Sequence, residues 1–205
     1  MGEDQGQFWD RVAERYAARP LKDPAAYEEM LVEVGGWLQP GDRVLEIGCG
    51  TGSTAVRLGG TVERWLGTDF SAEMVRIAQA KEAPEGVSFM QASAETEHDE
   101  APFDAICAFH ILHLLPDAPA TLAALRRQLV PGGLLISKTW CLRDFNPLMR
   151  MIFPILRARG YMPEIRQIRA RELRAMLTDA GFVLQGERHF GTHRHSRFIV
   201  ARRAE

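Results

Sequence analysis

VLEIGCGTG, residues 44–52, joins a short apolar strand to three glycines at alternate positions. Glycine allows the backbone to approach a ligand closely and to adopt dihedral angles that a β-carbon disfavours. Residues 53–58, STAVRL, then predict the start of a helix, whose first backbone N–H groups would point into the loop. This order of strand, glycine turn and helix is typical of a ligand-binding loop in an α/β protein.

Glu46 and Asp69 indicate which kind of ligand the loop accepts. The three glycines are evenly spaced and Glu46 precedes them, whereas the dinucleotide-binding pattern G-x-G-x-x-G spaces its glycines unevenly. A carboxylate here would repel a pyrophosphate but could accept hydrogen bonds from an ammonium or hydroxyl group. Residues 63–69, ERWLGTD, predict the next strand, and Asp69 at its end can bond both hydroxyls of a ribose. The two motifs therefore favour an amino acid or a nucleoside over NAD.

Together, VLEIGCGTG and the following GTDFSAEMVRIA resemble motifs of the class I S-adenosylmethionine-dependent methyltransferases, in the branch that acts on small molecules such as quinones and lipids. The resemblance covers most of the chain, because similar motifs recur at residues 103–106 (FDAI), 111–117 (ILHLLPD) and 125–136 (LRRQLVPGGLLI). Several motifs in the family's order are more specific than one glycine loop. The resemblance implies S-adenosyl-L-methionine as the cofactor and S-adenosyl-L-homocysteine as its product.

The resemblance also implies an α/β fold. This fold is a three-layer sandwich, with helices on both faces of a mostly parallel seven-stranded sheet whose last strand is antiparallel. The length of 205 residues and the apolar content of 46% fit one domain with a full core. We therefore expect a single domain over residues 1–205, with an N-terminal helical cap over 1–40 and a lid-like insert over 142–165.

Periodicity and turn residues predict where the individual elements lie. Strands are expected at residues 44–47, 63–69, 87–92, 103–106, 131–140, 182–184 and 198–201. Helices are expected at residues 8–16, 25–38, 71–82 and 171–180.

Most cofactor contacts are expected at positions that match the family's motifs. The resemblance implies that Tyr16 brings an aromatic hydroxyl near the methionine end, that Glu46 supports the same end, and that Asp69 holds the ribose. Ser93 stands where the family usually has an acid, and its hydroxyl can still bond an adenine amino group. Two further candidates, Phe70 and Met74, either touch the adenine or pack in the core. The other expected contacts are Gly48, Cys49, Gly50, Gly52, Ala94, Glu95 and Phe109.

Methyl transfer from a sulfonium depends mainly on alignment, because the donor leaves as a neutral thioether. A base is needed only when the acceptor is protonated at neutral pH, and histidine has a suitable pKa for that task. We therefore name His110 as the catalytic candidate, although a histidine in an apolar run such as AFHILHLL is also typical of a packed side chain. Residues expected at the acceptor end are His113, Trp140, Met149, Phe153 and His193.

The insert and the charge distribution bear on the acceptor. Residues 142–163 are apolar and Met-rich, so they are expected either to form an adaptable pocket wall or to complete the core or a dimer interface. Residues 143–205 hold 13 Lys and Arg against 6 Asp and Glu, whereas residues 1–142 hold 12 against 21. These late arginines are either a solvated face or a surface for peripheral contact with an anionic membrane or amphiphile.

Composition and spacing argue against several other classes of protein. Cys49, Cys107 and Cys141 form no CxxC pair, so neither a disulfide framework nor a zinc site is expected, and reduced thiols suggest a cytoplasmic protein. The histidines of HRHSR, residues 193–197, are too few to predict a metal site, and the acidic run 95–100 predicts a solvated loop. No apolar stretch is long enough for a transmembrane segment, and no aromatic-interleaved basic stripe predicts nucleic-acid binding.

We therefore expect transfer of a methyl group from S-adenosylmethionine to a small, lipophilic acceptor, by a monomer or a homodimer. The apolar insert is flanked by Arg143, Arg150, Arg157 and Arg159. This combination suggests an acceptor with an apolar body and an anionic or hydroxylated head. One alternative is a non-catalytic binding or scaffold protein of the same fold, and a weaker one is an NAD-type oxidoreductase. The sequence leaves open whether oxygen, nitrogen, carbon or sulfur is methylated.

Overall fold

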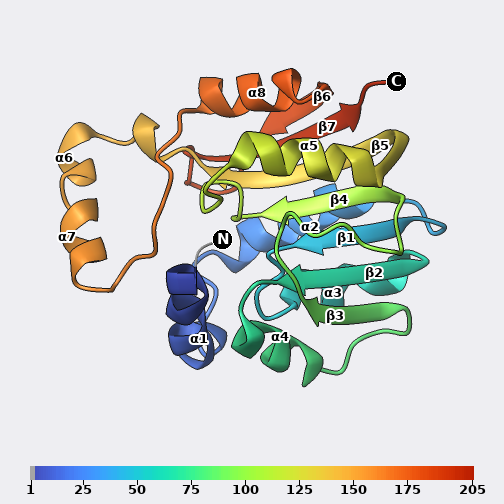
Figure 1. Ribbon diagram of the computed structural model, residues 1–205, viewed down its shortest axis with the longest axis horizontal. Coiled ribbons are helices and arrows are strands. Elements are labelled where there is room, and N and C mark those ends of the chain that lie inside the picture. The colour runs from blue at the N-terminus through green and yellow to red at the C-terminus, as the bar shows by residue number, and fades with distance from the viewer. Residues whose placement is uncertain (1–2) are drawn as a thin grey trace.

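The structure, a computed structural model, describes residues 3–205, except for the side chains of residues 3–5 and of Met149. Over this range seven strands form one sheet in the order β3-β2-β1-β4-β5-β7-β6 (Figure 1). The strands are β1 Arg43–Ile47, β2 Arg64–Asp69, β3 Val87–Gln91, β4 Phe103–Phe109, β5 Leu129–Trp140, β6 Phe182–Arg188 and β7 Ser196–Arg203. Strands β1 to β5 run parallel, whereas β7 is antiparallel to both of its neighbours. The sheet and its antiparallel last strand confirm the expected fold class.

The central strands are buried on both faces, as parallel strands covered by helices must be. In β4, the four residues from Ala105 to Ala108 are fully buried. The edge strand β6 instead exposes most of its side chains and continues to Arg188, beyond the strand expected at 182–184. Pairing with β7 along its whole length explains the extension, because backbone hydrogen bonds hold polar residues in a strand as well as apolar ones.

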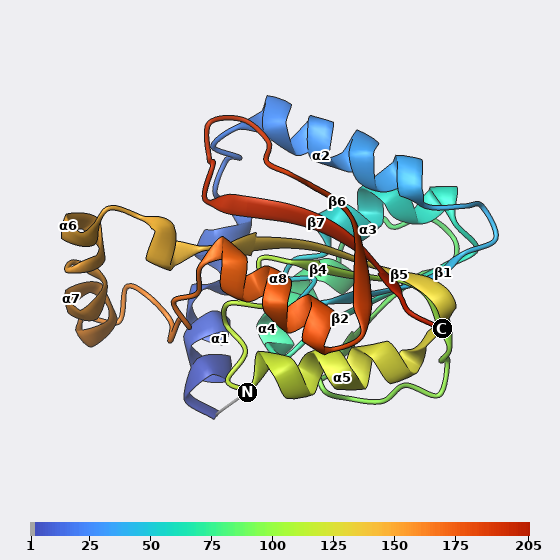
Figure 2. The ribbon, with the colours of Figure 1, turned by 90° about the horizontal axis from the view of Figure 1, so that it is seen from above.

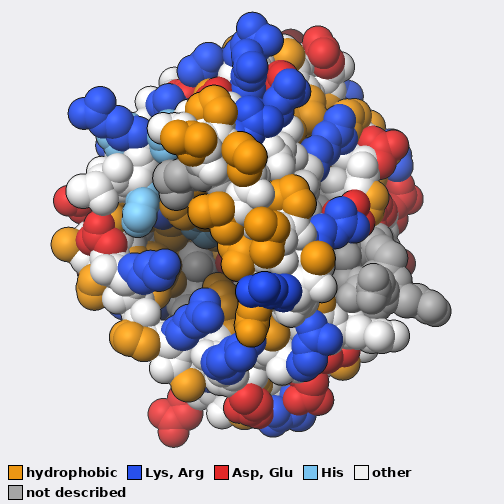
Figure 3. All heavy atoms as spheres, turned by 90° about the vertical axis from the view of Figure 1, so that its left-hand side faces the viewer, with side chains coloured by type: hydrophobic (Ala, Val, Ile, Leu, Met, Phe, Trp, Pro, Cys, Tyr) orange, Lys and Arg blue, Asp and Glu red, His pale blue; other side chains and the backbone are white. Residues whose placement is uncertain are grey.

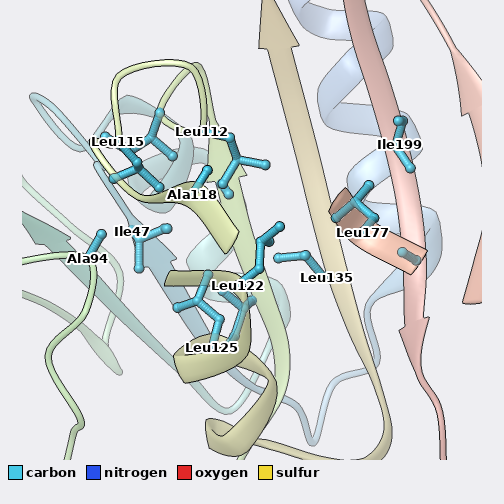
Figure 4. Close-up of a cluster of buried hydrophobic side chains, with 14 of the residues drawn as sticks. Ile47, Ala94, Leu112, Leu115, Ala118, Leu122, Leu125, Leu135, Leu177 and Ile199 are labelled. Carbon is cyan, nitrogen blue, oxygen red and sulfur yellow. The ribbon is translucent and has the colours of Figure 1, made fainter. Parts of the chain in front are cut away.

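Within the described range, eight α-helices complete the three layers. They are α1 Glu3–Ala17, α2 Pro24–Trp37, α3 Ser53–Leu58, α4 Ala72–Gln79, α5 Ala118–Gln128, α6 Pro147–Arg150, α7 Phe153–Ala158 and α8 Ala170–Asp179. Helices α2, α3 and α4 pack in one apolar cluster, and α5 and α8 pack in the other, on the opposite face (Figure 2). In Figure 4, Leu122 and Leu125 of α5 point toward Leu135 of β5. Truncating one such leucine to alanine typically costs about 2–5 kcal/mol.

Two segments lie outside these layers, on the side to which the carboxyl ends of β1 to β4 point (Figure 1). The first is α1, which packs beside α4. The second follows β5: the chain leaves the sheet through the 3-10 turn Leu142–Asp144, and α6 and α7 project from the body (Figures 1 and 2). The segment from residue 142 to residue 169, which contains α6 and α7, is called the insert below. Helix α2, by contrast, buries Met30, Leu31 and Val34 on the sheet.

Candidate active site

A cavity of about 600 Å³ lies at the carboxyl ends of the parallel strands, where α/β folds bind their ligands. Its volume is within the usual range of small-molecule pockets. The predicted site residues that line it are Tyr16, Gly48, Gly50, Asp69, Phe70, Met74, Ala94, Phe109, His110, His113, Trp140 and Phe153. The fold thus brings the glycine loop, the ends of β2, β4 and β5, helix α1 and the insert around one space.

The three glycines of the loop all have positive φ angles, but they serve different contacts. A β-carbon at Gly48 would lie 2.8 Å from the side chain of Ile111, and one at Gly52 would lie 2.7 Å from the ring of Phe89. A β-carbon at Gly50 would meet no atom within 4 Å, and Gly50 lines the cavity. Gly50 is therefore the position at which the bare backbone is available to a ligand, while the other two glycines are required by packing.

Asp69, the last residue of β2, ties the glycine loop to the next helix. One carboxylate oxygen accepts the N–H of Gly50 at 2.8 Å, and the other accepts the N–H of Ser71 at 2.9 Å. Burial raises the pKa of Asp69, the hydrogen bonds from Ser71 and Gly50 lower it, and the nearby charge of Asp10 raises it again. The carboxylate also lines the cavity, so it is fixed where it can accept hydrogen bonds from a ligand's hydroxyls.

Helix α1 is fastened over this end of the cavity. A carboxylate oxygen of Asp10 accepts the hydroxyl of Ser71 at 2.5 Å and the N–H of Glu73 at 3.2 Å, at the N-terminus of α4. Gly6 approaches Phe70 so closely that a β-carbon would lie 2.6 Å from the ring. Tyr16, farther along α1, lines the cavity beside Asp69, and local burial followed by the Asp69 charge raises the pKa of its hydroxyl.

His110 has an unusual backbone and an unpaired ring. Its φ of 58° is in the left-handed region, which is uncommon outside glycine, and its N–H donates to the carbonyl of Lys138 at 2.6 Å. The imidazole stacks on Trp140, with 5.8 Å between ring centroids, and its buried Nδ1 has no hydrogen-bond partner. Burial, and then the charges of Lys138, His113 and His193, lower the pKa of His110 to about 3. The ring is therefore neutral at physiological pH and retains an acceptor nitrogen.

His113 and an aromatic wall complete the other end of the cavity. His113 is buried, its Nδ1 has no partner, and burial lowers its pKa to about 4. Phe145 packs edge-on against Trp140, at 6.2 Å between centroids, and lies 6.4 Å from Phe153. Ile165 of the insert closes the same wall. This end of the cavity is apolar except for the two imidazoles.

Six predicted site residues lie near the cavity but do not line it, namely Glu46, Cys49, Gly52, Ser93, Glu95 and His193. Ser93 donates a hydrogen bond to Glu95, which also accepts one from Thr121 of α5 at 3.0 Å. His193 packs against Trp140 in a T-shaped contact, at 5.3 Å between centroids. The side chain of Met149 lies outside the described residues. The position of a residue in the sequence did not indicate whether its side chain lines the cavity or lies behind the residues that do.

Glu46 is fully buried behind the glycine loop. Its side chain accepts a hydrogen bond from the indole N–H of Trp65 at 3.1 Å, and only 2% of the residue is exposed. Burial raises the pKa of Glu46 to about 8, although the bond from Trp65 opposes the shift. The side chain is therefore largely protonated at neutral pH.

Sequence reasoning missed two cations on the cavity wall. Arg19 and Lys22 follow α1 and line the cavity, and their side chains make no ion pair or hydrogen bond within the described chain. Nothing in the sequence separates them from ordinary surface cations, because their place depends on how α1 docks. The arginines expected near the acceptor instead lie outside the cavity: Arg143 pairs with Glu172, and Arg157 pairs with Glu164.

The described residues contain no cluster of three or more side chains suited to holding a metal ion. A membrane-spanning helix is likewise not found in the part of the chain that the structure describes.

Comparison with known proteins identifies relatives. A model of the family described as methyltransferase domain matches residues 12–186. Trans-aconitate 2-methyltransferase of Azoarcus sp. (strain BH72) is 40% identical over 97 residues, 45% of this chain but only 36% of that enzyme. Ubiquinone biosynthesis O-methyltransferase of Pseudomonas syringae pv. tomato is 30% identical over 189 residues, 85% of this chain and 77% of that enzyme. A solved S-adenosylmethionine-dependent methyltransferase from Thermotoga maritima has a TM-score of 0.72 at 23% identity, covering 96% of this chain and 99% of its own.

S-adenosylmethionine is a nucleoside joined to a charged amino acid, and the cavity has groups for both parts. Gly50 leaves space for close approach, Asp69 offers oxygens to ribose hydroxyls, and Arg19 offers an unpaired cation to a carboxylate. This agreement is independent of the family match, which spans most of the chain. Since sequence match, fold and donor set agree, the chain belongs to the class I S-adenosylmethionine-dependent methyltransferases.

Proposed function

We propose that this protein transfers a methyl group from S-adenosylmethionine to a hydroxyl group of a small lipophilic acceptor. One observation carries the proposal: a single cavity joins Gly50 and Asp69 at one end to an apolar aromatic wall around His110 at the other. S-adenosylmethionine carries the methyl group on a sulfonium sulfur. When the methyl group is transferred, the rest of the cofactor becomes a neutral thioether. The protein's task is then to hold two molecules in line and to exclude water.

At the cofactor end, each described group has one task. Asp69, fixed by the N–H groups of Gly50 and Ser71, would accept hydrogen bonds from the ribose hydroxyls. Phe70 and Met74 would pack against the adenine, because they form the apolar part of this end. Arg19 would pair with the carboxylate of the methionine part, since a cation without a partner is available to an anion.

At the acceptor end, the wall favours an apolar and planar molecule. Trp140, Phe145 and Phe153 supply aromatic faces and edges, which attract other aromatic rings beyond simple area burial. The insert supplies Phe153 and Ile165, so the expected lid over residues 142–165 is part of the proposal. A hydroxyl acceptor is supported by the name of the ubiquinone-biosynthesis relative, an O-methyltransferase.

His110 would receive the acceptor's hydroxyl. His110 lines the cavity, and its neutral ring keeps one acceptor nitrogen, to which a ligand hydroxyl would donate. An oxygen that gains a methyl group becomes far more acidic, so even a weakly basic imidazole can take its proton at that moment. The left-handed backbone and the stacking on Trp140 hold the ring in one orientation for this step.

A non-catalytic binding protein of the same fold is the alternative. It is favoured by the bond between Ser93 and Glu95, because these two residues satisfy each other instead of lining the cofactor end. Both functions share the cofactor site, so cofactor binding does not separate them. Methylation of a lipophilic phenol by the purified protein, inhibited by S-adenosylhomocysteine, would exclude the alternative, whereas binding without turnover on a broad acceptor panel would favour it.

The Asp69→Ala variant tests the cofactor end. Binding of S-adenosylhomocysteine should weaken by about 2 kcal/mol, roughly 30-fold, because hydrogen bonds to a carboxylate are lost. Isothermal titration calorimetry measures the affinity. Asp104→Ala is the matched control, since Asp104 also accepts a backbone N–H, that of Arg43 at 2.9 Å, but at the opposite end of the sheet. Equal affinities of the two variants would contradict the site.

The His110→Asn variant tests the acceptor end. Asparagine tolerates the left-handed backbone but has no basic nitrogen, so kcat on a hydroxyl acceptor should fall about 100-fold. The affinity for S-adenosylhomocysteine should stay within a few-fold of the native value. His189→Asn, at an exposed position, is the control. An unchanged kcat in His110→Asn would mean that the imidazole only packs against Trp140.

A further inference from the structure

The insert carries apolar side chains that no part of the described chain covers. Helix α7 has no buried residue, although its sequence, FPILRA, is mostly apolar. Leu148 is 73% exposed, Met151 71%, Ile152 51% and Ile155 55%. Large side chains exposed together on one projecting segment are unusual for a folded chain and mark an interaction surface.

The insert is also strongly cationic. Residues 142–169 hold six arginines against two acids, Asp144 and Glu164, so this segment is net positive while the whole chain is net negative at −2. The side chains of Arg159 and Arg166 make no ion pair or hydrogen bond within the described chain. On this side of the molecule, hydrophobic side chains gather in the middle and Lys and Arg side chains surround them (Figure 3).

The same segment forms one wall of the cavity. Phe153, Met162 and Ile165 line both the main cavity and a second groove of about 410 Å³, whose lining residues all belong to the insert. Arg157 also lines that second groove. The insert, which carries the exposed apolar side chains, is therefore also part of the wall of the main cavity.

We infer that the insert docks on an anionic lipid bilayer, with Leu148, Ile152 and Ile155 in the interfacial region and Arg159 and Arg166 against the lipid phosphates. The apolar centre matches the acyl boundary, and the cationic rim matches the headgroup charge. This inference extends the proposed function, because a lipophilic acceptor dissolved in the bilayer would then lie next to the cavity wall. Docking itself requires neither cofactor nor acceptor.

The charge and the exposed apolar side chains of the insert favour an anionic bilayer over a second copy of the chain or a nucleic acid. A second copy of the chain would bring the same excess of arginines against this face, and like charges at close range oppose association. A nucleic acid would satisfy the arginines but would leave the exposed Leu148 and Ile152 unpaired with any apolar surface. An anionic bilayer satisfies both features at once.

Vesicle co-sedimentation of the full-length native protein tests the inference. Vesicles of phosphatidylcholine with about 30% phosphatidylglycerol should bind the protein, and raising the salt concentration should weaken binding because the charge is screened. Leu148→Ser/Ile152→Ser should reduce the partition constant about tenfold, through lost apolar burial. Arg159→Gln/Arg166→Gln should reduce it about 30-fold, through lost charge.

Matched controls are available elsewhere on the chain. Val32→Ser/Val183→Ser removes two exposed apolar side chains, 75% and 54% exposed, from α2 and β6. Arg57→Gln and Arg64→Gln remove the same charge as the arginine variant from α3 and β2. These controls should bind vesicles as the native protein does.

Three outcomes would overturn the inference: no vesicle binding, equal binding to neutral and anionic vesicles, or equal loss in the control variants. Light scattering adds a fourth, because a dimer that Leu148→Ser/Ile152→Ser converts to a monomer would make the face a contact between copies. Calorimetry with S-adenosylhomocysteine is run on every variant. Retained cofactor binding without vesicle binding would reject docking while leaving the proposed methyl transfer intact.

Discussion

Replacing Glu46 by glutamine will stabilise the folded protein by about 3 kcal/mol at pH 7, because it removes a carboxyl group whose ionisation opposes folding. Burial raises the pKa of Glu46 from 4.5 to about 8 in the folded state. The unfolded chain releases this proton near pH 4.5, so the folded state binds more protons between the two values. The contribution of Glu46 is therefore fully favourable below pH 4.5 and is lost as the pH rises through 8.

Glutamine preserves the local contact, since its amide oxygen can still accept the indole N–H of Trp65. Urea unfolding between pH 5 and pH 8 measures the effect. The native protein should lose stability relative to the variant as the pH rises across this range. Glu33→Gln serves as the control, because Glu33 also accepts an indole N–H, that of Trp37 at 3.0 Å, but lies partly exposed on α2. Parallel pH profiles of native protein and Glu46→Gln would refute the prediction.

Acid will destabilise the native protein through His110 and His113 by about 4 kcal/mol at pH 5, or about 2 kcal/mol for each ring. Burial lowers the pKa of His110 to about 3 and that of His113 to about 4, both from 6.5. Between these pKa values and 6.5, the two imidazoles are therefore protonated in the unfolded chain but neutral in the folded protein. This contribution is fully present above pH 6.5 and is lost as the pH falls toward 4 and then 3.

The double variant His110→Asn/His113→Gln should lack this acid-induced loss, because neither amide titrates. The measurement is the difference in unfolding free energy between native and variant protein at pH 7 and pH 5. Comparing the two proteins cancels the opposite contribution of Glu46, which is common to both. The exposed His189→Asn variant should follow the native profile. An identical loss in native and double variant would show that the two rings are not buried as described.

The sequence predicted the sheet and several residues of the cavity wall because those features depend on local patterns. Glycines at 48 and 50, and an acid at the end of the next strand, are placed by the strand-loop-helix geometry itself. Asp69 therefore lies in the cavity as expected. Element boundaries were less predictable, since α4 ends at Gln79 and β6 continues to Arg188.

Glu46 illustrates what a local pattern leaves out. Side chains alternate along a strand, so Glu46 points to the same face of the sheet as Val44, away from Leu45 and Ile47. On that face Trp65 of β2 offers its indole N–H. Whether a hydrogen-bond donor lies on that face depends on the neighbouring strand β2. Residues 44–52 alone therefore could not predict that Glu46 is buried against Trp65.

Arg19 and Lys22 illustrate the second limit. Their place on the cavity wall depends on a long-range contact, the docking of α1 on α4 through Asp10 and Ser71. Exposed cations after a helix are common, and no periodicity marks the few that face a ligand. The aromatic wall formed by Phe145 and its neighbours depends in the same way on how the insert folds back.

The cavity wall is divided between two segments that lie far apart in the sequence. Helix α1 covers the Phe70 end and is held by Asp10, whereas the insert, with Phe153, closes the end around Trp140. Under the proposed function, the nucleoside would lie beneath α1 and the acceptor beneath the insert, so each ligand would be covered by a different segment of the chain.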